Sequence, residues 1–186
     1  KLNNDYLKSQ PNKENMCYVY TLAKLLKINN KSFLNSMELF EGLPHRYEIF
    51  LKKKNVTFIN DSKATSFTAT KYALLSNKNI FWILGGIEKH RDKINLHNIN
   101  QNITKAYIIG KNTEYFKKQL RNKIKFVVTK NLTKTVNQVF KDIRDVKNKC
   151  TILFSPAAAS FDQFKNFEMR GFKFKKLVNF YAKKYT

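Results

Sequence analysis

Polar side chains follow two runs of residues that are typical of buried strands. Residues 150–154 are almost entirely apolar, and the small, turn-prone segment after them contains Ser160. Residues 56–59 are rich in β-formers, and the segment after them carries a carboxylate, an ammonium group and a hydroxyl, on Asp61, Lys63 and Thr65. Open α/β sheets bind their ligands beyond the carboxyl ends of their strands. The two segments together therefore predict a binding site at one edge of a sheet.

The spacing of Asp61, Lys63 and Thr65 favours a shared direction. In an extended chain, residues two apart point to the same side, so these three side chains would face one crevice. Such a set could orient a ribose, a phosphate or a substrate carboxylate. The alternative is structural: Asp61 or Ser62 caps the helix expected next, and Lys63 is left in solvent.

Ser160 lies near the expected start of the last helix, at residues 163–185. The free N–H groups and the dipole of a helix N-terminus favour anions, so a substrate carboxylate could bind there with help from the Ser160 hydroxyl. The alternative is that Ser160 or Asp162 caps the helix. Phe164 and Phe167 are spaced as side chains that pack into a core.

Two further basic residues stand near features that permit a ligand to approach. Gly85 and Gly86 end an apolar run, and Lys89 follows them and could contact an anion. Arg46 lies on a short connector, residues 42–46, from which it could reach a bound phosphate. The alternatives are an ordinary turn at the glycines and a surface ion pair at Arg46. No GxxxxGK[ST] phosphate loop occurs in the chain.

Periodicity and turn residues predict two parts. Helical spacing at residues 15–28 and 32–40 predicts a helical hairpin. The connector 42–46 is the best candidate for a domain boundary, which divides residues 1–43 from residues 44–186.

Beyond that boundary, strands alternate with helices, which predicts an α/β fold with a Rossmann-like, mostly parallel sheet flanked by helices. Strands are expected at 47–52, 56–59, 79–84, 105–109, 124–128 and 151–154, and helices at 65–76, 113–121, 132–146 and 163–185.

The composition and charge of the chain limit the kinds of partner that it is expected to bind. The formal net charge of +23 comes mainly from lysines spread along the whole chain, whereas nucleic-acid sites more often gather arginines and aromatic residues on one face. We therefore expect no nucleic-acid partner.

No apolar run could cross a membrane and no apolar leader is visible, so we expect no membrane partner and a cytoplasmic location. No Cys or His residues have metal-ligand spacing, so we expect no metal site in the chain. The first residue, Lys1, suggests a fragment of a longer protein.

The order and spacing of four segments resemble a known family. The segments are residues 42–46, residues 59–65, residues 84–86 with Lys89, and residues 153–171. Together they resemble the C-terminal part of the Mur ligases of peptidoglycan synthesis that add D-glutamate to UDP-N-acetylmuramoyl-L-alanine. The resemblance implies that residues 1–43 are the last helices of a central ATP-binding domain. Residues 44–186 would then be the C-terminal domain, which binds the incoming amino acid.

The resemblance also implies a reaction and roles for individual residues. The family uses ATP and Mg²⁺ to form an acyl phosphate, which the amine of D-glutamate attacks; the Mg²⁺ ligands are expected upstream of this chain. Lys63 would act at the reaction centre by orienting the phosphate and the substrates. The other implied contacts are to ATP from Asn12, Arg46 and Asp61, and to D-glutamate from Thr65, Lys89, Ser160 and Phe167.

By the same resemblance, we expect a monomer that alone binds D-glutamate weakly and catalyses nothing. Two alternatives stay open at this point. The chain could be a basic α/β module that binds nucleic acid, in which case its affinity would fall steeply with salt. It could also be a domain of a related Mur-type ligase that adds another amino acid.

Overall fold

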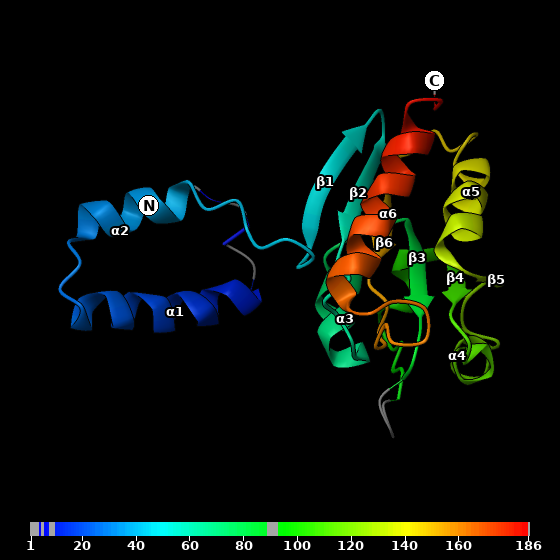
Figure 1. Ribbon diagram of the computed structural model, residues 1–186, viewed down its shortest axis with the longest axis horizontal. Helices are drawn as coiled ribbons and strands as arrows, with labels where there is room; N and C mark the ends of the chain where they lie inside the picture. Colours follow the sequence, from blue (N-terminus) through cyan, green and yellow to red (C-terminus); the bar gives the residue numbers. More distant parts are fainter. Residues whose placement is uncertain (1–3, 5, 8–9, 89–92, 186) are drawn as a thin grey trace. The chain divides into compact units, whose positions relative to one another are not determined.

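The computed structural model describes residues 4, 6–7, 10–88 and 93–185. The chain divides into two compact units, Lys1–Leu43 and Pro44–Thr186 (Figure 1).

The first unit is a pair of helices, α1 (Gln10–Leu25) and α2 (Asn30–Glu38). The side chain of Asn29 caps the start of α2. Near the other end of α2, the side-chain amide of Asn4 donates hydrogen bonds of 2.8 Å to the carbonyl of Met37 and 2.9 Å to the carbonyl of Phe40, just beyond the helix. α1 begins earlier than residue 15, because the proline at position 11 is tolerated in the first turn of a helix.

The second unit is built on a six-stranded sheet with the order β1-β2-β6-β3-β4-β5. β1 runs antiparallel to β2, and every other neighbouring pair is parallel. The prediction of an α/β fold with a mostly parallel sheet is confirmed. The strands are β1 (Glu48–Lys53), β2 (Val56–Asn60), β3 (Ile80–Gly85), β4 (Ile103–Ile109), β5 (Phe126–Lys130) and β6 (Cys150–Phe154).

Helices cover both faces of this sheet (Figure 1). The apolar side chains of α3 (Phe67–Leu75) and α4 (Thr113–Leu120) form one core with the sheet. Apolar side chains from the segment that leads to the short helix η1 (Asn100–Asn102) belong to the same core. Those of α5 (Leu132–Asp142) and α6 (Phe167–Ala182) form the second core on the other face. Between the two cores, β3 is buried along its whole length, as its uninterrupted apolar sequence predicts.

Two helices begin later than predicted. α3 begins at Phe67 rather than at residue 65, because Ser66 is its cap. α6 begins at Phe167 rather than at residue 163, because the side chain of Asn166 caps it by accepting a hydrogen bond of 2.8 Å from a first-turn N–H. Ser160 therefore lies in the loop between β6 and α6. The capping alternatives are wrong for Asp61, Ser62, Ser160 and Asp162.

α6 packs closely against the connector that precedes β1. A Cβ added at Gly171 would lie 2.2 Å from Nδ1 of His45. The buried imidazole of His45 is itself held, because its Nδ1 lies 2.9 Å from Nδ2 of Asn60. This position of the helix therefore requires a residue without a side chain, although glycine disfavours helices.

We predict that Gly171→Ala lowers the free energy of unfolding, even though alanine is the better helix former. The added methyl group must displace His45 from Asn60, and overpacking of this kind costs about 1–3 kcal/mol. Denaturant unfolding of the full chain measures the change. The matched control is Asn179→Ala on the exposed side of α6, which should alter stability by less than about 0.5 kcal/mol. A Gly171→Ala protein at least as stable as the wild type would contradict the prediction.

Candidate functional site

Asp61 is a buried carboxylate just beyond the end of β2, with 8% of its surface exposed. Its Oδ2 accepts a hydrogen bond of 2.6 Å from the hydroxyl of Ser155, and its Oδ1 accepts one of 3.1 Å from the N–H of Tyr47. Burial raises the pKa of Asp61 to about 6, against the opposing effects of these hydrogen bonds and of the charge on Arg46. Asp61 thus ties the end of β2 to the end of β6.

The segment after β2 is a turn, so the expectation of an extended segment is wrong. The N–H of Ala64 donates to the carbonyl of Asp61 at 2.9 Å, and the N–H of Lys63 donates to the carbonyl of His45 at 3.0 Å. After Asp61, these backbone hydrogen bonds take the place of the bonds that β2 forms with its neighbouring strands. The carboxylate of Asp61 is bonded inside the protein, whereas Lys63 and Thr65 are half-buried.

Lys63 meets the first residue of α6. Its Nζ lies 3.9 Å from the centroid of the Phe167 ring, which is a cation–π contact. Phe167 is half-buried and its ring lies beside that of His45, so it is not the core residue that its spacing suggests. The carbonyl of Phe167 accepts a hydrogen bond of 2.9 Å from the hydroxyl of Ser62. The segment after β2 and the start of α6 therefore form one contact region.

The loop between β6 and α6 folds back over the end of β3. Ile87 and Ala159 exchange two backbone hydrogen bonds, of 2.9 and 2.8 Å. Gly86 has a φ of +137°, and a Cβ there would lie 2.2 Å from the carbonyl oxygen of Ala159. The group that lies close to the backbone at this glycine is therefore the loop after β6, rather than a ligand. Ser160 follows in the same loop and is 3% exposed, and Lys89 lies outside the described residues.

Arg170 joins these segments from the first turn of α6. Its guanidinium donates to the hydroxyl of Ser62 at 3.1 Å, to the carbonyl of Ser62 at 2.8 Å and to the carbonyl of Ala158 at 3.0 Å. Arg170 is not among the site residues predicted from the sequence. The available signal was its place four residues before Phe174, on the side of the helix that faces the core.

The remaining predicted residues lie elsewhere. Arg46 is exposed on the connector before β1, close enough for its charge to lower the pKa of Asp61. Asn12 belongs to the first unit, where its Nδ2 donates to the carbonyl of Tyr6 at 2.8 Å. The segments that carry the other predicted residues meet at the carboxyl ends of β2 and β6, and those residues are Asp61, Lys63, Thr65, Ser160 and Phe167.

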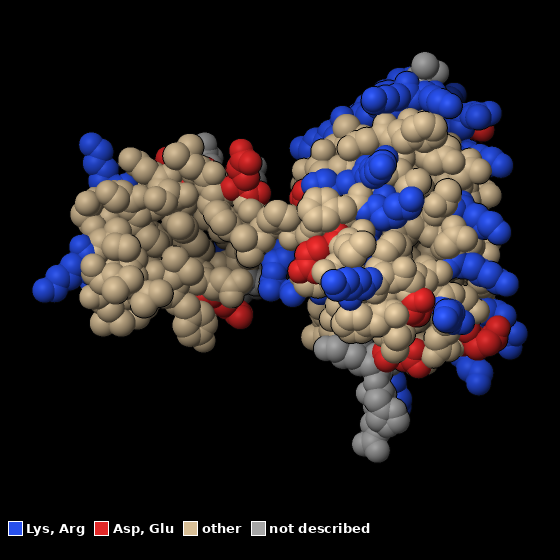
Figure 2. Space-filling model, viewed as in Figure 1, with Lys and Arg blue, Asp and Glu red and all other residues tan. Residues whose placement is uncertain are grey.

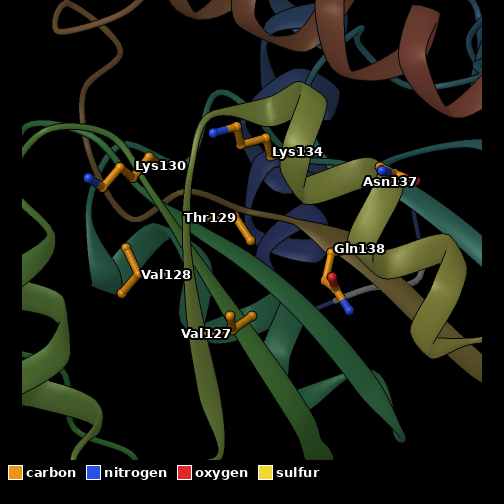
Figure 3. A pocket seen from close by; sticks show the side chains of 7 residues that line it. All are labelled: Val127, Val128, Thr129, Lys130, Lys134, Asn137 and Gln138. Atoms are coloured by element: carbon orange, nitrogen blue, oxygen red, sulfur yellow. The ribbon is translucent and has the colours of Figure 1, made fainter.

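A separate groove of about 460 Å³ runs between the edge strand β5 and α5 (Figure 3). None of the predicted site residues that the structure describes lines it. Its walls combine apolar, amide and basic side chains, from Val127, Val128, Thr129, Lys130, Lys134, Asn137 and Gln138. The described residues contain no group of three or more His, Cys, Asp or Glu side chains that could hold a metal ion.

Basic side chains gather away from the predicted site. Figure 2 shows them over the end of the second unit where β1 turns into β2 and where α6 ends. Contacts confirm this grouping, since Lys53 donates to the carbonyl of Ala182 and Lys54 lies over the ring of Tyr185. This end carries the amino ends of β2 and β6, so on the face shown this group of basic residues lies opposite the carboxyl ends. Of the helices described, none combines the length and the apolar character that a membrane crossing needs.

Known proteins resemble this chain in sequence and in fold. No protein-family model matches it. A UDP-N-acetylmuramoylalanine–D-glutamate ligase of Wolbachia sp. subsp. Brugia malayi is 42% identical over 160 residues, which cover 86% of this chain and 32% of the relative. Relatives of the same name from Rickettsia felis and Caulobacter vibrioides are 35% and 36% identical, over 98% and 93% of this chain and 41% and 37% of their own lengths.

A crystal structure of MurF from Acinetobacter baumannii has a similar fold, with a TM-score of 0.61 and 14% identity over 84% of this chain and 35% of that one. At this identity the likeness concerns the fold alone. The sequence relatives extend over most of this chain, whereas the chain spans only 32–41% of their length. The chain therefore belongs to the Mur ligase family, as a homologue of part of its UDP-N-acetylmuramoylalanine–D-glutamate ligases.

Proposed function

We propose that this chain supplies the D-glutamate-binding part of a ligase that joins D-glutamate to UDP-N-acetylmuramoyl-L-alanine through an ATP-derived acyl phosphate. One observation carries the proposal. Parts of two segments on which the resemblance rests, residues 60–65 and residues 155–171, meet at the carboxyl ends of the neighbouring strands β2 and β6. That is the edge at which an open α/β sheet binds its ligand.

The charges at this edge suit a dicarboxylate. D-glutamate presents two carboxylates, which require cations and hydrogen-bond donors. Lys63 and the buried Arg170 supply positive charge, and the negative charge of Asp61 is offset by the hydrogen bond that its Oδ2 accepts from Ser155. In the proposed site, D-glutamate is held by Thr65, Lys89, Ser160 and Phe167, while Lys63 orients the phosphate and the attacking amine.

ATP would bind at the same edge through Arg46 and Asp61, with Asn12 as the third proposed contact. The exposed guanidinium of Arg46 fits a phosphate group, and Asp61 fits a hydroxyl donor. The described residues contain no group of three or more His, Cys, Asp or Glu side chains that could hold a metal ion, and in this proposal the Mg²⁺ ligands belong to the rest of the ligase. When bound, ATP and Mg²⁺ would activate the carboxylate. The part played by this chain is to bind and orient D-glutamate.

The first unit fits the end of an ATP-binding domain whose remainder is not part of this chain. Its two helices leave large apolar side chains in solvent, with Tyr18 78% exposed and Leu25 75% exposed. Leu22, Leu26 and Leu39 are exposed as well. Apolar surface of this extent is typical of an interface. In the proposed ligase it packs against the rest of the central domain.

We predict that the chain binds D-glutamate weakly and catalyses no ligation by itself. NMR titration of the 186-residue chain should show shifts confined to residues 62–65 and 158–167, and none with L-glutamate, lysine or D-alanyl-D-alanine. Ser160→Ala should weaken binding by about tenfold, because a hydrogen bond to a charged group is lost. Lys63→Ala should do the same, and Lys71→Ala, at an exposed position of α3, should have no effect.

Two results would contradict this proposal. One is turnover by the isolated chain. The other is tight binding of RNA that falls steeply with salt while D-glutamate causes no shift, because that pattern belongs to the nucleic-acid alternative.

We predict that the stability of the chain depends on the ionisation of Asp61. Its pKa is raised from 3.8 to about 6 in the folded protein, so the folded state holds this proton more tightly than the unfolded state. The contribution of Asp61 to stability is therefore full below about pH 3.8 and is lost as the pH rises through about 6. Asp61→Asn should remove that loss, so the variant should gain melting temperature relative to the wild type between pH 4 and 7.

The measurement is the difference in melting temperature between wild type and Asp61→Asn at each pH, which cancels the titration of other groups. One such group is Glu48. Burial alone would raise its pKa, but its hydrogen bonds, of which that from Lys175 is the largest, leave it below the usual value. The contribution of Glu48 to stability is therefore lost as the pH falls, in the opposite direction to that of Asp61. A difference that stays constant from pH 4 to 7 would refute the assigned role of Asp61.

A further inference from the structure

Arg170 is a fully buried guanidinium, with 1% of its surface exposed. All of its hydrogen-bond acceptors are oxygens of neutral groups, namely a hydroxyl and two backbone carbonyls. In the part of the chain that the structure describes, no carboxylate forms an ion pair with it. Burying a charge without a counterion is costly, so an arginine at this place needs a reason other than stability.

The three hydrogen bonds of Arg170 link the segments that carry the proposed D-glutamate contacts. Two go to Ser62, next to Lys63 in the turn after β2. The third goes to Ala158, two residues before Ser160 in the loop after β6. The hydroxyl of Ser62 also donates a hydrogen bond to the carbonyl of Phe167, in the helix that carries Arg170. One planar group therefore holds all three segments at fixed separations.

Only arginine can fill this place. Its guanidinium presents N–H groups in a rigid plane, whereas the ammonium of lysine is a single point with freely rotating donors. Burial lowers the pKa of Arg170 to about 10, so the group is still charged at neutral pH. The carboxylate whose charge opposes that change is Asp162, and its Oδ2 is engaged by the N–H of Lys111 at 2.9 Å. The positive charge of Arg170 is therefore only partly balanced, by the charge of Asp162, behind the loop that contains Ser160.

We propose that Arg170 is a positioning residue that sets the separation of the turn after β2 from the loop after β6, and thereby the width of the D-glutamate subsite. The proposal rests on the function proposed above for these segments. Arg170 does not touch the ligand. It acts through the backbone of Ser62 and Ala158, and its charge favours an anion at the site that these segments frame.

The test compares Arg170→Lys, which keeps the charge but loses the planar donor set, with Arg170→Met, which loses both. Arg144→Lys and Arg144→Met are matched controls, because Arg144 is exposed after α5. In the 186-residue chain, amide NMR signals of residues 62–65 and 158–160 should move in both Arg170 variants and in neither control. Both Arg170 variants should bind D-glutamate at least about tenfold more weakly than wild type.

Three outcomes would overturn the positioning role. Arg170→Lys could leave the two segments and the affinity unchanged. It could bind normally while Arg170→Met binds poorly, which would assign the effect to charge alone. Amide signals could move throughout the chain, which would indicate a general structural role. If the wild type does not bind D-glutamate, the proposed function fails, but the amide signals of Arg170→Lys still decide whether this residue positions the segments.

Discussion

The insertion of β6 between β2 and β3 is the constraint on which the proposed site depends. Phe154, at the end of β6, pairs with Asn60 on one side and with Ile83 on the other. The N–H of Asp61 then donates to the carbonyl of Phe154 at 2.7 Å, so the ladder continues one residue past the end of β2. Segments separated by some 94 residues of sequence thereby become neighbours. A parallel strand can enter the middle of a sheet only through a long crossover, which α5 provides here.

The junction of these segments is held by polar groups that burial makes costly. Burial raises the pKa of Asp61 and lowers that of Arg170, so in both cases the protein opposes the charged form. Each group is satisfied by hydrogen bonds from more than one segment, and a buried group left without partners would cost more than these bonds gain. The result is a junction with few alternative arrangements, because any shift of one loop leaves several buried groups unpaired.

The sequence predicted the sheet better than it predicted the site. Apolar runs such as residues 80–84 favour buried strands, and their alternation with helices predicts a parallel sheet. Helix starts were less predictable, because several residues that can cap a helix precede both α3 and α6. Ser66 and Asn166 are the caps, and nothing local distinguishes them from Ser62 or Asp162.

Contacts between distant segments were beyond the reach of sequence spacing. Residues 61, 63 and 65 share a direction only in an extended chain. The chain turns here instead, and the carbonyl of His45 accepts the N–H of Lys63. The roles of Arg170 and of the glycine at position 86 follow from loops that approach from elsewhere in the chain. The resemblance to a family named the proposed site residues, but it did not reveal what holds them in place.

The groups at the carboxyl ends of β2 and β6 indicate which steps of the proposed reaction this chain supports. An amine must lose its proton before it attacks an acyl phosphate, and a general base must lie within hydrogen-bond reach of that proton. Asp61 has a suitable pKa, but Ser155 and Tyr47 already donate to both of its oxygens. The described groups of the proposed site that favour anions are Lys63 and the buried Arg170. In the proposed ligase, activation of the carboxylate belongs to the rest of the protein, to which the exposed apolar side chains of the first unit would attach.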